Sequence, residues 1–354
     1  MKRRSFLVGV GGAVGVGALG VPLDVEGQES SSTSGETSAV GLPRRVLGRT
    51  GEKISTVGFP GLALVHYEQE VCNAGIRKAF DRGVNYFDVA PAYGKGDAEI
   101  KMGIGLQGIE RNKFFLSCKT RMRDKEGARK ELERSLKRLK TDHFDLYQLH
   151  CLRQPDEVKQ ALAPGGAMET IVKAKEEGKL GYIGFSAHTT KAALAALSGF
   201  RFDTVMFPVN FVEYYTIGFG KAVLELADKQ GAGVIAIKPV SRGLWPKGVE
   251  RTRRWWYRPV EDEKEIGMAM RFTLGLKGVA TGIPVSFLDI LDKVIEASLE
   301  DRPNTKAEAE EMRQLAAGCE SVFRREEQRV ALAAPPQVPL YPDSPHEGCR
   351  GAYA

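Results

Sequence analysis

Three hydrophobic segments of the chain each end in an ionisable residue that an ordinary core would exclude. These residues are Asp88 with Tyr93 shortly after it, Lys119, and His150. Helical stretches separate the segments, so we expect parallel strands whose carboxyl ends lie on one side of a sheet. A cation beside a phenol stabilises the phenolate, which makes a tyrosine a usable proton donor near neutral pH. The pattern therefore indicates an acid–base catalytic site.

The composition is that of a folded globular protein. The 354 residues are 42% hydrophobic and 27% charged, and the formal net charge is +6. A chain of this length accommodates two ordinary domains or one α/β barrel, which needs about 250 residues. The mild, dispersed positive charge hints at an anionic ligand and does not indicate nucleic acid.

Residues 1–40 have the pattern of an export signal followed by a linker. The pair Arg3-Arg4 precedes an apolar, glycine-rich run and resembles a twin-arginine signal. The run is too short and too glycine-rich for a membrane span, which needs about 20 residues. A GxGxxG spelling at 15–20 is rejected as a dinucleotide-binding turn because no strand precedes it. We expect export by the twin-arginine machinery, a periplasmic location, and no stable membrane span in the mature chain.

From Pro43 onward, apolar runs alternate with helical patterns. Strands are expected over 54–59, 84–88, 114–119, 144–150, 182–185, 204–207, 234–237 and 278–281. Helices are expected over 69–81, 98–105, 125–139, 167–177, 191–197, 218–229, 261–276 and 287–297. Eight βα units favour a closed α/β fold, a (β/α)8 TIM barrel over 41–300, rather than an open doubly wound sheet. Residues 301–354 would add a C-terminal helical extension over 305–329 and a proline-rich tail, packed on or near the barrel.

With this barrel and these residues in place, the chain resembles the aldo-keto reductase family. The resemblance runs from about Arg44 to Ala297 and is carried by RVLGRTG (45–51), NYFDVAPAYG (85–94) and FDLYQLH (144–150). It implies an NAD(P)H-dependent oxidoreductase that reduces an aldehyde or ketone to an alcohol by hydride transfer. The expected partner is a small carbonyl substrate.

The resemblance also implies a role for each ionisable residue. Tyr93 would protonate the carbonyl oxygen, Lys119 would stabilise the phenolate, and Asp88 would orient Lys119 through a buried ion pair. His150 would hydrogen-bond the carbonyl oxygen. Taken singly, each residue is more often structural, and a buried ion pair perturbs pKa values without any catalysis. Only the four together on one barrel face favour an enzyme.

The cofactor side matches the family less well. The resemblance implies NADP(H) in preference to NAD(H), bound by Gly61, Ser186, His188, Asn210, Lys238 and Ser286. However, Ala187 stands where the family commonly has an asparagine, and Met206 where a glutamine is usual. The loop 251–258 alternates arginines with aromatic residues, so it either grips a nucleotide or packs on the C-terminal tail. Binding of single-stranded nucleic acid by such an isolated loop is not expected.

Two functions from other classes compete with the reductase. A non-catalytic nicotinamide-binding sensor or partner protein on the same barrel is compatible with the altered residues at 187 and 206. A metal-dependent hydrolase is disfavoured because the five histidines form no HxH or HxxxH pair. The five cysteines form no CxxC pair, so we predict no metal site and expect Cys118 and Cys151 to be buried and unreactive.

Overall fold

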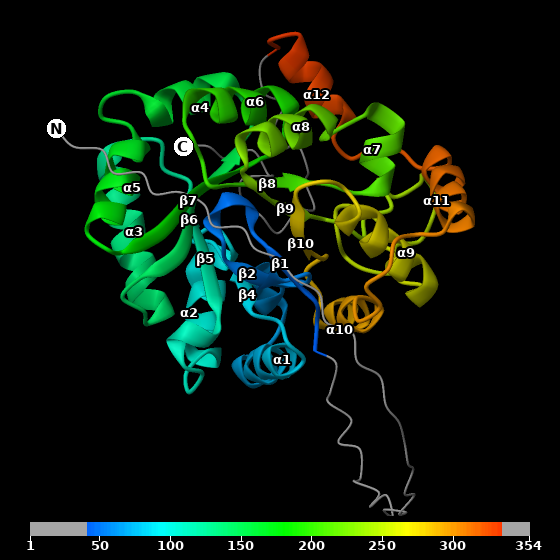
Figure 1. Ribbon diagram of the computed structural model, residues 1–354, viewed down its shortest axis with the longest axis horizontal. Helices are drawn as coiled ribbons and strands as arrows, with labels where there is room; N and C mark the ends of the chain where they lie inside the picture. The colour runs from blue at the N-terminus through cyan, green and yellow to red at the C-terminus, as the bar shows by residue number, and fades with distance from the viewer. Residues whose placement is uncertain (1–40, 335–354) are drawn as a thin grey trace, which may run out of the picture. The chain divides into compact units, whose positions relative to one another are not determined.

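The computed structural model describes residues 41–334, in which the strands are surrounded by helices (Figure 1). The strands are β1 (Arg44–Val46), β2 (Lys53–Ser55), β3 (Gly58–Pro60), β4 (Tyr86–Asp88), β5 (Phe115–Thr120), β6 (Phe144–Leu152), β7 (Leu180–Ala187), β8 (Thr204–Pro208), β9 (Gly233–Ile237) and β10 (Val279–Ile283). The helices are α1 (Gln69–Asp81), α2 (Asp97–Gly105), α3 (Lys125–Leu139), α4 (Pro155–Leu162), α5 (Ala167–Glu176), α6 (Thr190–Gly199), α7 (Phe211–Ile217), α8 (Lys221–Gln230), α9 (Glu263–Leu274), α10 (Leu288–Ala297), α11 (Lys306–Ala317) and α12 (Arg324–Ala331).

The strands β3 to β10 form one eight-stranded sheet in which sequential strands pair in parallel. The first and last strands meet at a seam, where Val57 forms a parallel bridge with Gly282. There the Gly282 N–H donates to the Thr56 carbonyl at 2.9 Å. The sheet is thereby closed into a ring, and the predicted (β/α)8 barrel is confirmed. The antiparallel hairpin β1–β2 lies outside this sheet.

The alternation of side chains along the strands divides the barrel interior into layers. At the amino-terminal end, Tyr86, Phe115 and Leu146 form an apolar cluster with Leu47 and Ile54, which come from the hairpin segment. Asp88, Lys119 and His150 follow these three residues on β4, β5 and β6 by an even number of positions. Their ionisable side chains therefore also point inward. The same strands therefore carry a sealed apolar layer at one end and a polar layer at the other.

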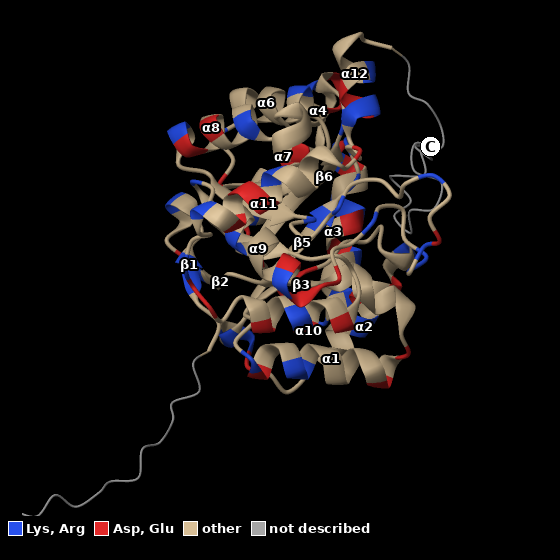
Figure 2. Ribbon diagram, turned by 90° about the vertical axis from the view of Figure 1, so that its right-hand side faces the viewer, with Lys and Arg blue, Asp and Glu red and all other residues tan. Residues whose placement is uncertain are grey.

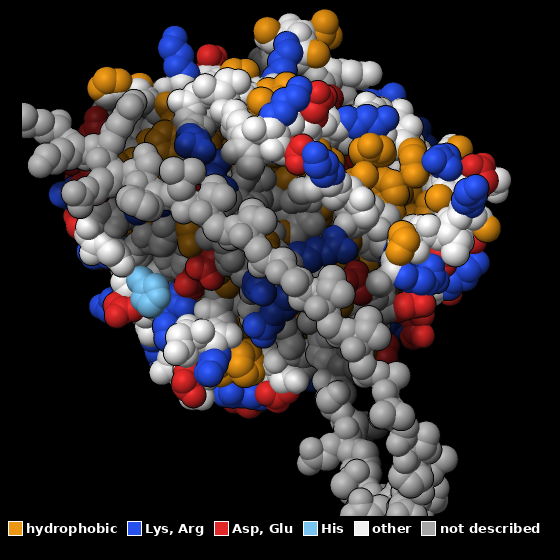
Figure 3. All heavy atoms as spheres, in the orientation of Figure 1, with side chains coloured by type: hydrophobic (Ala, Val, Ile, Leu, Met, Phe, Trp, Pro, Cys, Tyr) orange, Lys and Arg blue, Asp and Glu red, His pale blue; other side chains and the backbone are white. Residues whose placement is uncertain are grey.

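The outward positions of the strands pack against the helices. Phe87, Leu116 and Leu149 belong to the large core cluster that lies between the sheet and the surrounding helices. Figures 2 and 3 show Lys and Arg interspersed with Asp and Glu over the helices and loops of the faces they present. On these faces the charge is mixed in sign, in keeping with the mild net charge of the sequence.

Two predicted elements are divided in the structure. The strand expected over 54–59 is two strands, because the Ser55 N–H donates to the Asn85 side chain at 2.6 Å instead of to a neighbouring strand. The extension expected as one helix over 305–329 is two helices, α11 and α12, which are joined by a short segment that ends at Phe323. Phe323, at the end of this segment, contacts His188.

The predicted signal and linker over 1–40 and the tail beyond Ala334 lie outside the described residues. Among the helices of residues 41–334, none combines the length and the apolar character that a membrane crossing requires.

Candidate active site

A buried ion pair lies at the carboxyl ends of β4 and β5. The Lys119 Nζ lies 2.6 Å from Oδ1 and 2.5 Å from Oδ2 of Asp88. Asp88 is 3% exposed and Lys119 is fully buried. Burial raises the pKa of the Asp88 carboxyl, and the Lys119 ammonium opposes that rise. The pair therefore fixes the Lys119 ammonium inside the barrel mouth, with the Asp88 carboxylate as its counterion.

The phenol of Tyr93 contacts this cation. The Lys119 Nζ lies 3.3 Å from the Tyr93 Oη and also donates to the Val89 carbonyl at 3.2 Å. Tyr93 belongs to a turn after β4, in which its N–H donates to the Ala90 carbonyl at 3.0 Å. This turn folds the phenol back over the strand ends, so the hydroxyl lies where the ammonium can stabilise a negative oxygen.

His150 lies beside the phenol, on β6. The rings of Tyr93 and His150 have their centroids 5.7 Å apart and meet edge to face at 82°. The His150 carbonyl accepts a hydrogen bond from Arg123 at 2.7 Å, which fixes the backbone at this point. The structure thus brings together Asp88 and Tyr93 with Lys119 and His150.

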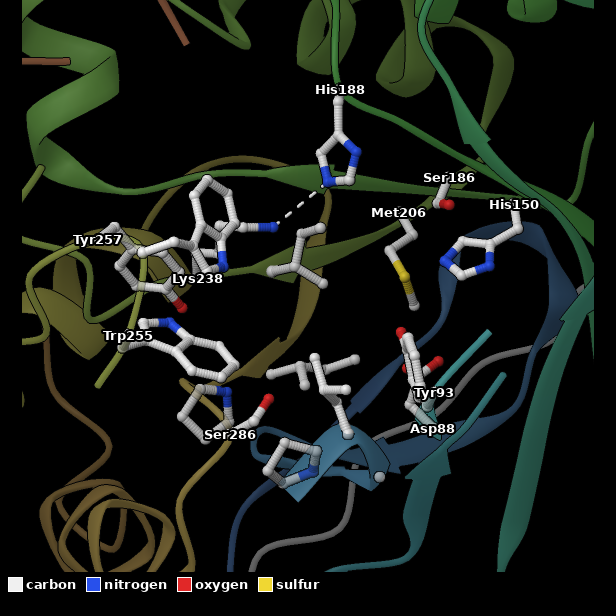
Figure 4. A pocket seen from close by; sticks show the side chains of 17 residues that line it. Asp88, Tyr93, His150, Ser186, His188, Met206, Lys238, Trp255, Tyr257 and Ser286 are labelled. Atoms are coloured by element: carbon white, nitrogen blue, oxygen red, sulfur yellow. Dashed lines mark hydrogen bonds between the residues drawn. The ribbon is translucent and has the colours of Figure 1, made fainter. Parts of the chain in front are cut away.

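Asp88, Tyr93 and His150 border a cavity that is partly open to solvent, and its empty space, including the open part, is about 630 Å³. Its polar lining includes Asp88, Tyr93, His150, Ser186, His188, Lys238 and Ser286. Its apolar lining includes Met206, Ile237, Trp255, Trp256, Tyr257 and Ile283. Figure 4 shows Asp88 and Tyr93 on one side of this space and Lys238, Trp255 and Tyr257 on the other.

The cavity also accounts for two other predicted residues, Gly61 and Ser186. Gly61 lines it at a point where an added Cβ would lie 2.1 Å from the Asp88 carbonyl oxygen, so only glycine fits this approach of two backbones. Ser186 lines it as well, and its hydroxyl accepts a hydrogen bond from the Cys151 N–H at 2.7 Å. Ser186 therefore supports the irregular end of β6, where the register with β7 shifts.

Asn210 does not line this cavity. Its side-chain oxygen accepts the Glu213 N–H at 3.0 Å and caps the start of α7. The sequence holds a signal for this role, because an asparagine followed three residues later by a glutamate is a common helix start.

His188 and Lys238 meet on the cavity wall opposite Tyr93. The His188 Nε2 lies 3.3 Å from the Lys238 Nζ, the contact drawn as a dashed line in Figure 4. On the other side of the ring, His188 Nδ1 lies 3.0 Å from the Cys151 sulfur. Cys118 and Cys151 are both buried.

The C-terminal extension supports this wall from behind through Phe323, which contacts the lining residue His188. The Phe323 ring stacks on His188, with centroids 5.8 Å apart and an interplanar angle of 12°. It also stacks on Phe219 at 4.9 Å. The sequence alone did not indicate this role, because the helical pattern over 305–329 suggested an outer surface helix.

Buried polar contacts anchor the extension on the barrel. Glu326 is 1% exposed and pairs with Arg153 at 2.8 Å and with Arg329 at 2.6 Å. Glu213 accepts the Val322 N–H at 2.7 Å and the hydroxyl of Ser321 at 2.5 Å. Burial raises the pKa of the Glu213 carboxyl to about 7.

The loop after β9 lies over the other end of the cavity. Trp255 and Tyr257 are each 2% exposed and form part of the wall, so the aromatic residues of this loop face inward. Arg253 points away and pairs with Glu261 and Asp289. Among the described residues, no cluster of histidine, cysteine and carboxylate side chains is arranged to hold a metal ion.

Comparison with known proteins gives the class of this protein. The model of the aldo/keto reductase family matches residues 62–313, so the chain belongs to that family.

Individual relatives agree with this assignment. L-galactose dehydrogenase of Arabidopsis thaliana is 29% identical over 219 residues, which cover 56% of this chain and 66% of that protein, just under two thirds of its length. Among solved structures, an aldo-keto reductase from Bacillus halodurans in its holo form aligns with a TM-score of 0.65 at 22% identity, covering 81% of this chain and 99% of its own. An aldo-keto reductase from Klebsiella pneumoniae in complex with NADPH gives 0.60 at 19% identity, covering 78% of this chain and 95% of its own. At these identities, the solved structures support the fold.

Proposed function

We propose that the protein is an NAD(P)H-dependent oxidoreductase that reduces an aldehyde or ketone to an alcohol, with Tyr93 as the general acid. One observation carries the proposal. The Tyr93 hydroxyl lies 3.3 Å from an ammonium that is itself fixed by a buried carboxylate, on the wall of a cavity.

Each residue of this group would have a separate task. Tyr93 donates a proton to the carbonyl oxygen as negative charge develops there, and Lys119 stabilises the phenolate left behind. Asp88 holds the ammonium in place. His150, beside the phenol, orients the carbonyl oxygen. Preorganised donors at a developing oxyanion typically lower the barrier by several kcal/mol, on the order of 3 kcal/mol per donor.

The cavity has the donor set that a nicotinamide nucleotide requires. The Lys238 ammonium and the hydroxyls of Ser186 and Ser286 lie among aromatic and aliphatic walls, which suits a ligand with anionic groups and flat rings. When bound, a reduced nicotinamide would supply the hydride. We propose NADP(H) in preference to NAD(H), in keeping with the NADPH complex named for the Klebsiella relative.

Turnover of the purified protein tests the proposal. NADPH oxidation should be followed with a panel of small aldehydes and ketones, and the reverse reaction with NADP⁺ should include L-galactose, because a relative carries that activity in its name. Tyr93→Phe should lower kcat by a hundredfold or more, on the order expected for loss of a general acid. Tyr215→Phe is the matched control, because Tyr215 is a half-buried tyrosine of α7 that is not among the residues lining the cavity.

The outcomes separate two functions. Full activity in Tyr93→Phe would exclude this tyrosine as the acid. Tight binding of NADPH without turnover of any carbonyl would instead favour a nicotinamide-binding sensor, in which Ala187 and Met206 replace the residues usual in the family.

We also propose that residues 1–40 direct export through the twin-arginine machinery. A fusion of this segment to a reporter should appear in the periplasm of a bacterial host. Replacement of Arg3 and Arg4 by lysine should retain the reporter in the cytoplasm. Export of the lysine variant at the original rate would contradict the proposal.

A further inference from the structure

We infer that Cys151 and His188 are positioning residues that hold the Lys238 ammonium ready for the anionic diphosphate portion of the nicotinamide cofactor. The inference rests on the proposed function, because it names how the same cavity would hold its ligand. Four groups contribute: a buried thiol, an imidazole, an ammonium, and a phenyl ring from the C-terminal extension.

The first three groups form a line from the barrel wall to the cavity. The Cys151 sulfur lies 3.0 Å from His188 Nδ1, and His188 Nε2 lies 3.3 Å from the Lys238 Nζ. Cys151 is fully buried and His188 is 8% exposed, whereas both His188 and Lys238 line the cavity. The line therefore runs from the buried Cys151 sulfur through His188 to the Lys238 ammonium at the cavity.

Hydrogen-bond chemistry fixes the direction of these contacts. A lysine ammonium has three donors and no acceptor, so His188 Nε2 must accept from Lys238. A neutral imidazole carries a single N–H, which then lies on Nδ1 and donates to the sulfur of Cys151. The ammonium and the thiol thus favour the same histidine tautomer, because the sulfur accepts the proton that the contact with Lys238 leaves on Nδ1.

At both ends of the line, the backbone adopts a left-handed conformation that residues other than glycine rarely adopt. Cys151 has a φ of 58° and Lys238 a φ of 61°. Such residues persist where the surrounding contacts enforce them, and they cluster at ligand sites. Here the Cys151 N–H donates to the Ser186 hydroxyl, and the Lys238 N–H donates to the Ile283 carbonyl at 3.1 Å. Both turns direct their side chains toward the same wall.

Aromatic rings restrict the ammonium further. The Lys238 Nζ lies 5.5 Å from the centroid of the Trp256 ring and 5.7 Å from that of Phe323. Phe323 also stacks on His188, so it contacts two members of the line. A cation between ring faces loses rotational freedom without losing its charge. The C-terminal extension thereby contributes to the placement of Lys238.

Lys238 brings a positive charge to the cavity wall, and a positive charge attracts an anion. Among the lining residues that the structure describes, Asp88 is the one carboxylate, and it pairs with Lys119. A diphosphate is a strong acceptor for an ammonium, and such charge-assisted bonds are about twice as strong as neutral ones. The diphosphate, which lies between the two ring systems of a nicotinamide dinucleotide, is the anionic group that we assign to this ammonium.

Binding of NADPH, measured without turnover, tests the inference. The Kd is obtained from quenching of tryptophan fluorescence, since Trp255 and Trp256 line the cavity. Lys238→Met should raise the Kd by about ten- to a hundredfold, as expected for a charge-assisted hydrogen bond. Inorganic diphosphate should compete with NADPH in the wild-type protein and lose that effect in Lys238→Met. Lys221→Met, which removes a lysine at the start of α8, should leave the Kd unchanged.

The positioning residues are tested by their conservative and drastic variants. Cys151→Ala should raise the Kd by about three- to tenfold through loss of one hydrogen bond. Cys151→Ser, which keeps an acceptor, should recover most of the affinity. Phe323→Ala should act like Cys151→Ala, and Phe323→Leu should be milder. Thermal unfolding of each variant verifies that the fold is intact.

A spectroscopic measurement separates positioning from a merely structural effect. In protein labelled with ¹⁵N-histidine, the His188 signals, assigned by their loss in His188→Gln, should show a proton on Nδ1. Cys151→Ala should shift that tautomer equilibrium, and Cys151→Ser should not.

The results distinguish failure of this inference from failure of the proposed function. If the wild-type protein binds NADPH and Lys238→Met binds it within twofold, Lys238 has no role in affinity and the inference is wrong. If the wild-type protein shows no affinity for NADPH or NADH, the proposed function itself falls. A His188 proton on Nε2 would overturn the positioning role of Cys151.

Discussion

The two sides of the cavity are built in different ways (Figure 4). On the side of Tyr93, the proposed proton donor (the proton-donor side), Asp88, Lys119 and His150 lie on three adjacent strands and point inward because the strand period requires it. On the opposite side, Lys238 follows the end of a strand and Trp256 lies in a long loop. Phe323 comes from the extension beyond the barrel. The first side is a product of sheet register, and the second is assembled from segments distant in sequence.

This difference predicts which property each side controls. Changes on the proton-donor side should alter the rate of the chemical step, because its groups contact the reacting oxygen in the proposed function. Changes on the opposite side should alter ligand affinity and the attachment of the loop and extension. Four measurements examine this division.

The largest effect is expected for Lys119→Met. It leaves the Asp88 carboxylate buried without its partner, and breaking such a pair typically costs about 3–5 kcal/mol of folding free energy. Activity should fall by a hundredfold or more as well, on the order of an acid–base loss. Urea denaturation and steady-state turnover measure the two effects. The double variant Asp88→Asn with Lys119→Met should recover stability but not activity, and recovery of both would contradict the catalytic role.

His150→Ala should affect the rate with little effect on affinity for the cofactor. Loss of one donor at a developing oxyanion lowers kcat by about a hundredfold or more. The Kd for NADPH should stay within about twofold, because the opposite wall is untouched. Single-turnover kinetics and fluorescence titration provide the two numbers. An effect on the Kd alone would show that His150 acts in cofactor binding and not in the chemical step, which would contradict the expected division.

The attachment of the extension should depend on pH through Glu213. Burial raises the pKa of its carboxyl to about 7 from an ordinary value of 4.5, so the folded protein binds a proton more tightly than the unfolded chain. Its contribution to stability is full below the unfolded value and is lost as the pH rises through about 7. The loss amounts to about 3 kcal/mol. Urea denaturation across this range should show the slope in the wild type and a flatter profile in Glu213→Gln, and identical slopes would exclude this carboxyl as the source.

The smallest effect is expected for Arg253→Ala. This arginine pairs with Asp289 and Glu261 at the surface, and its side chain is 22% exposed. Exposed pairs usually contribute less than about 1 kcal/mol, so unfolding and the Kd for NADPH should barely change. Added salt should reduce even that difference. A tenfold change in the Kd would show that the loop depends on this pair for its position.

The division also explains what the sequence could predict. The barrel was predictable because eight alternating patterns leave few other topologies, and Asp88, Lys119 and His150 were predictable because each ends a hydrophobic strand. Their predicted catalytic roles stay predictions until rates are measured. The contact between Tyr93 and Lys119 follows from a short turn, which depends on local sequence.

The opposite wall was harder to foresee because loop and extension placement depends on distant contacts. The aromatic residues at 255–257 allowed two interpretations, and only the fold shows that they face inward. Asn210 was assigned by resemblance to a ligand role, which stays a prediction. The structure shows that its side-chain oxygen caps α7, and Glu213 three residues later was the sequence signal for this cap. The break before Phe323 follows Gly318, a residue type that commonly ends helices.

Phe323 has a consequence for how the protein is made. It is translated after all eight strands of the barrel, and it supplies the ring against which His188 and Lys238 rest. A nascent chain that has already emerged as far as β10 still lacks this ring. Under the inference above, full affinity for the cofactor therefore requires synthesis past Phe323, after all the strands of the barrel have been made.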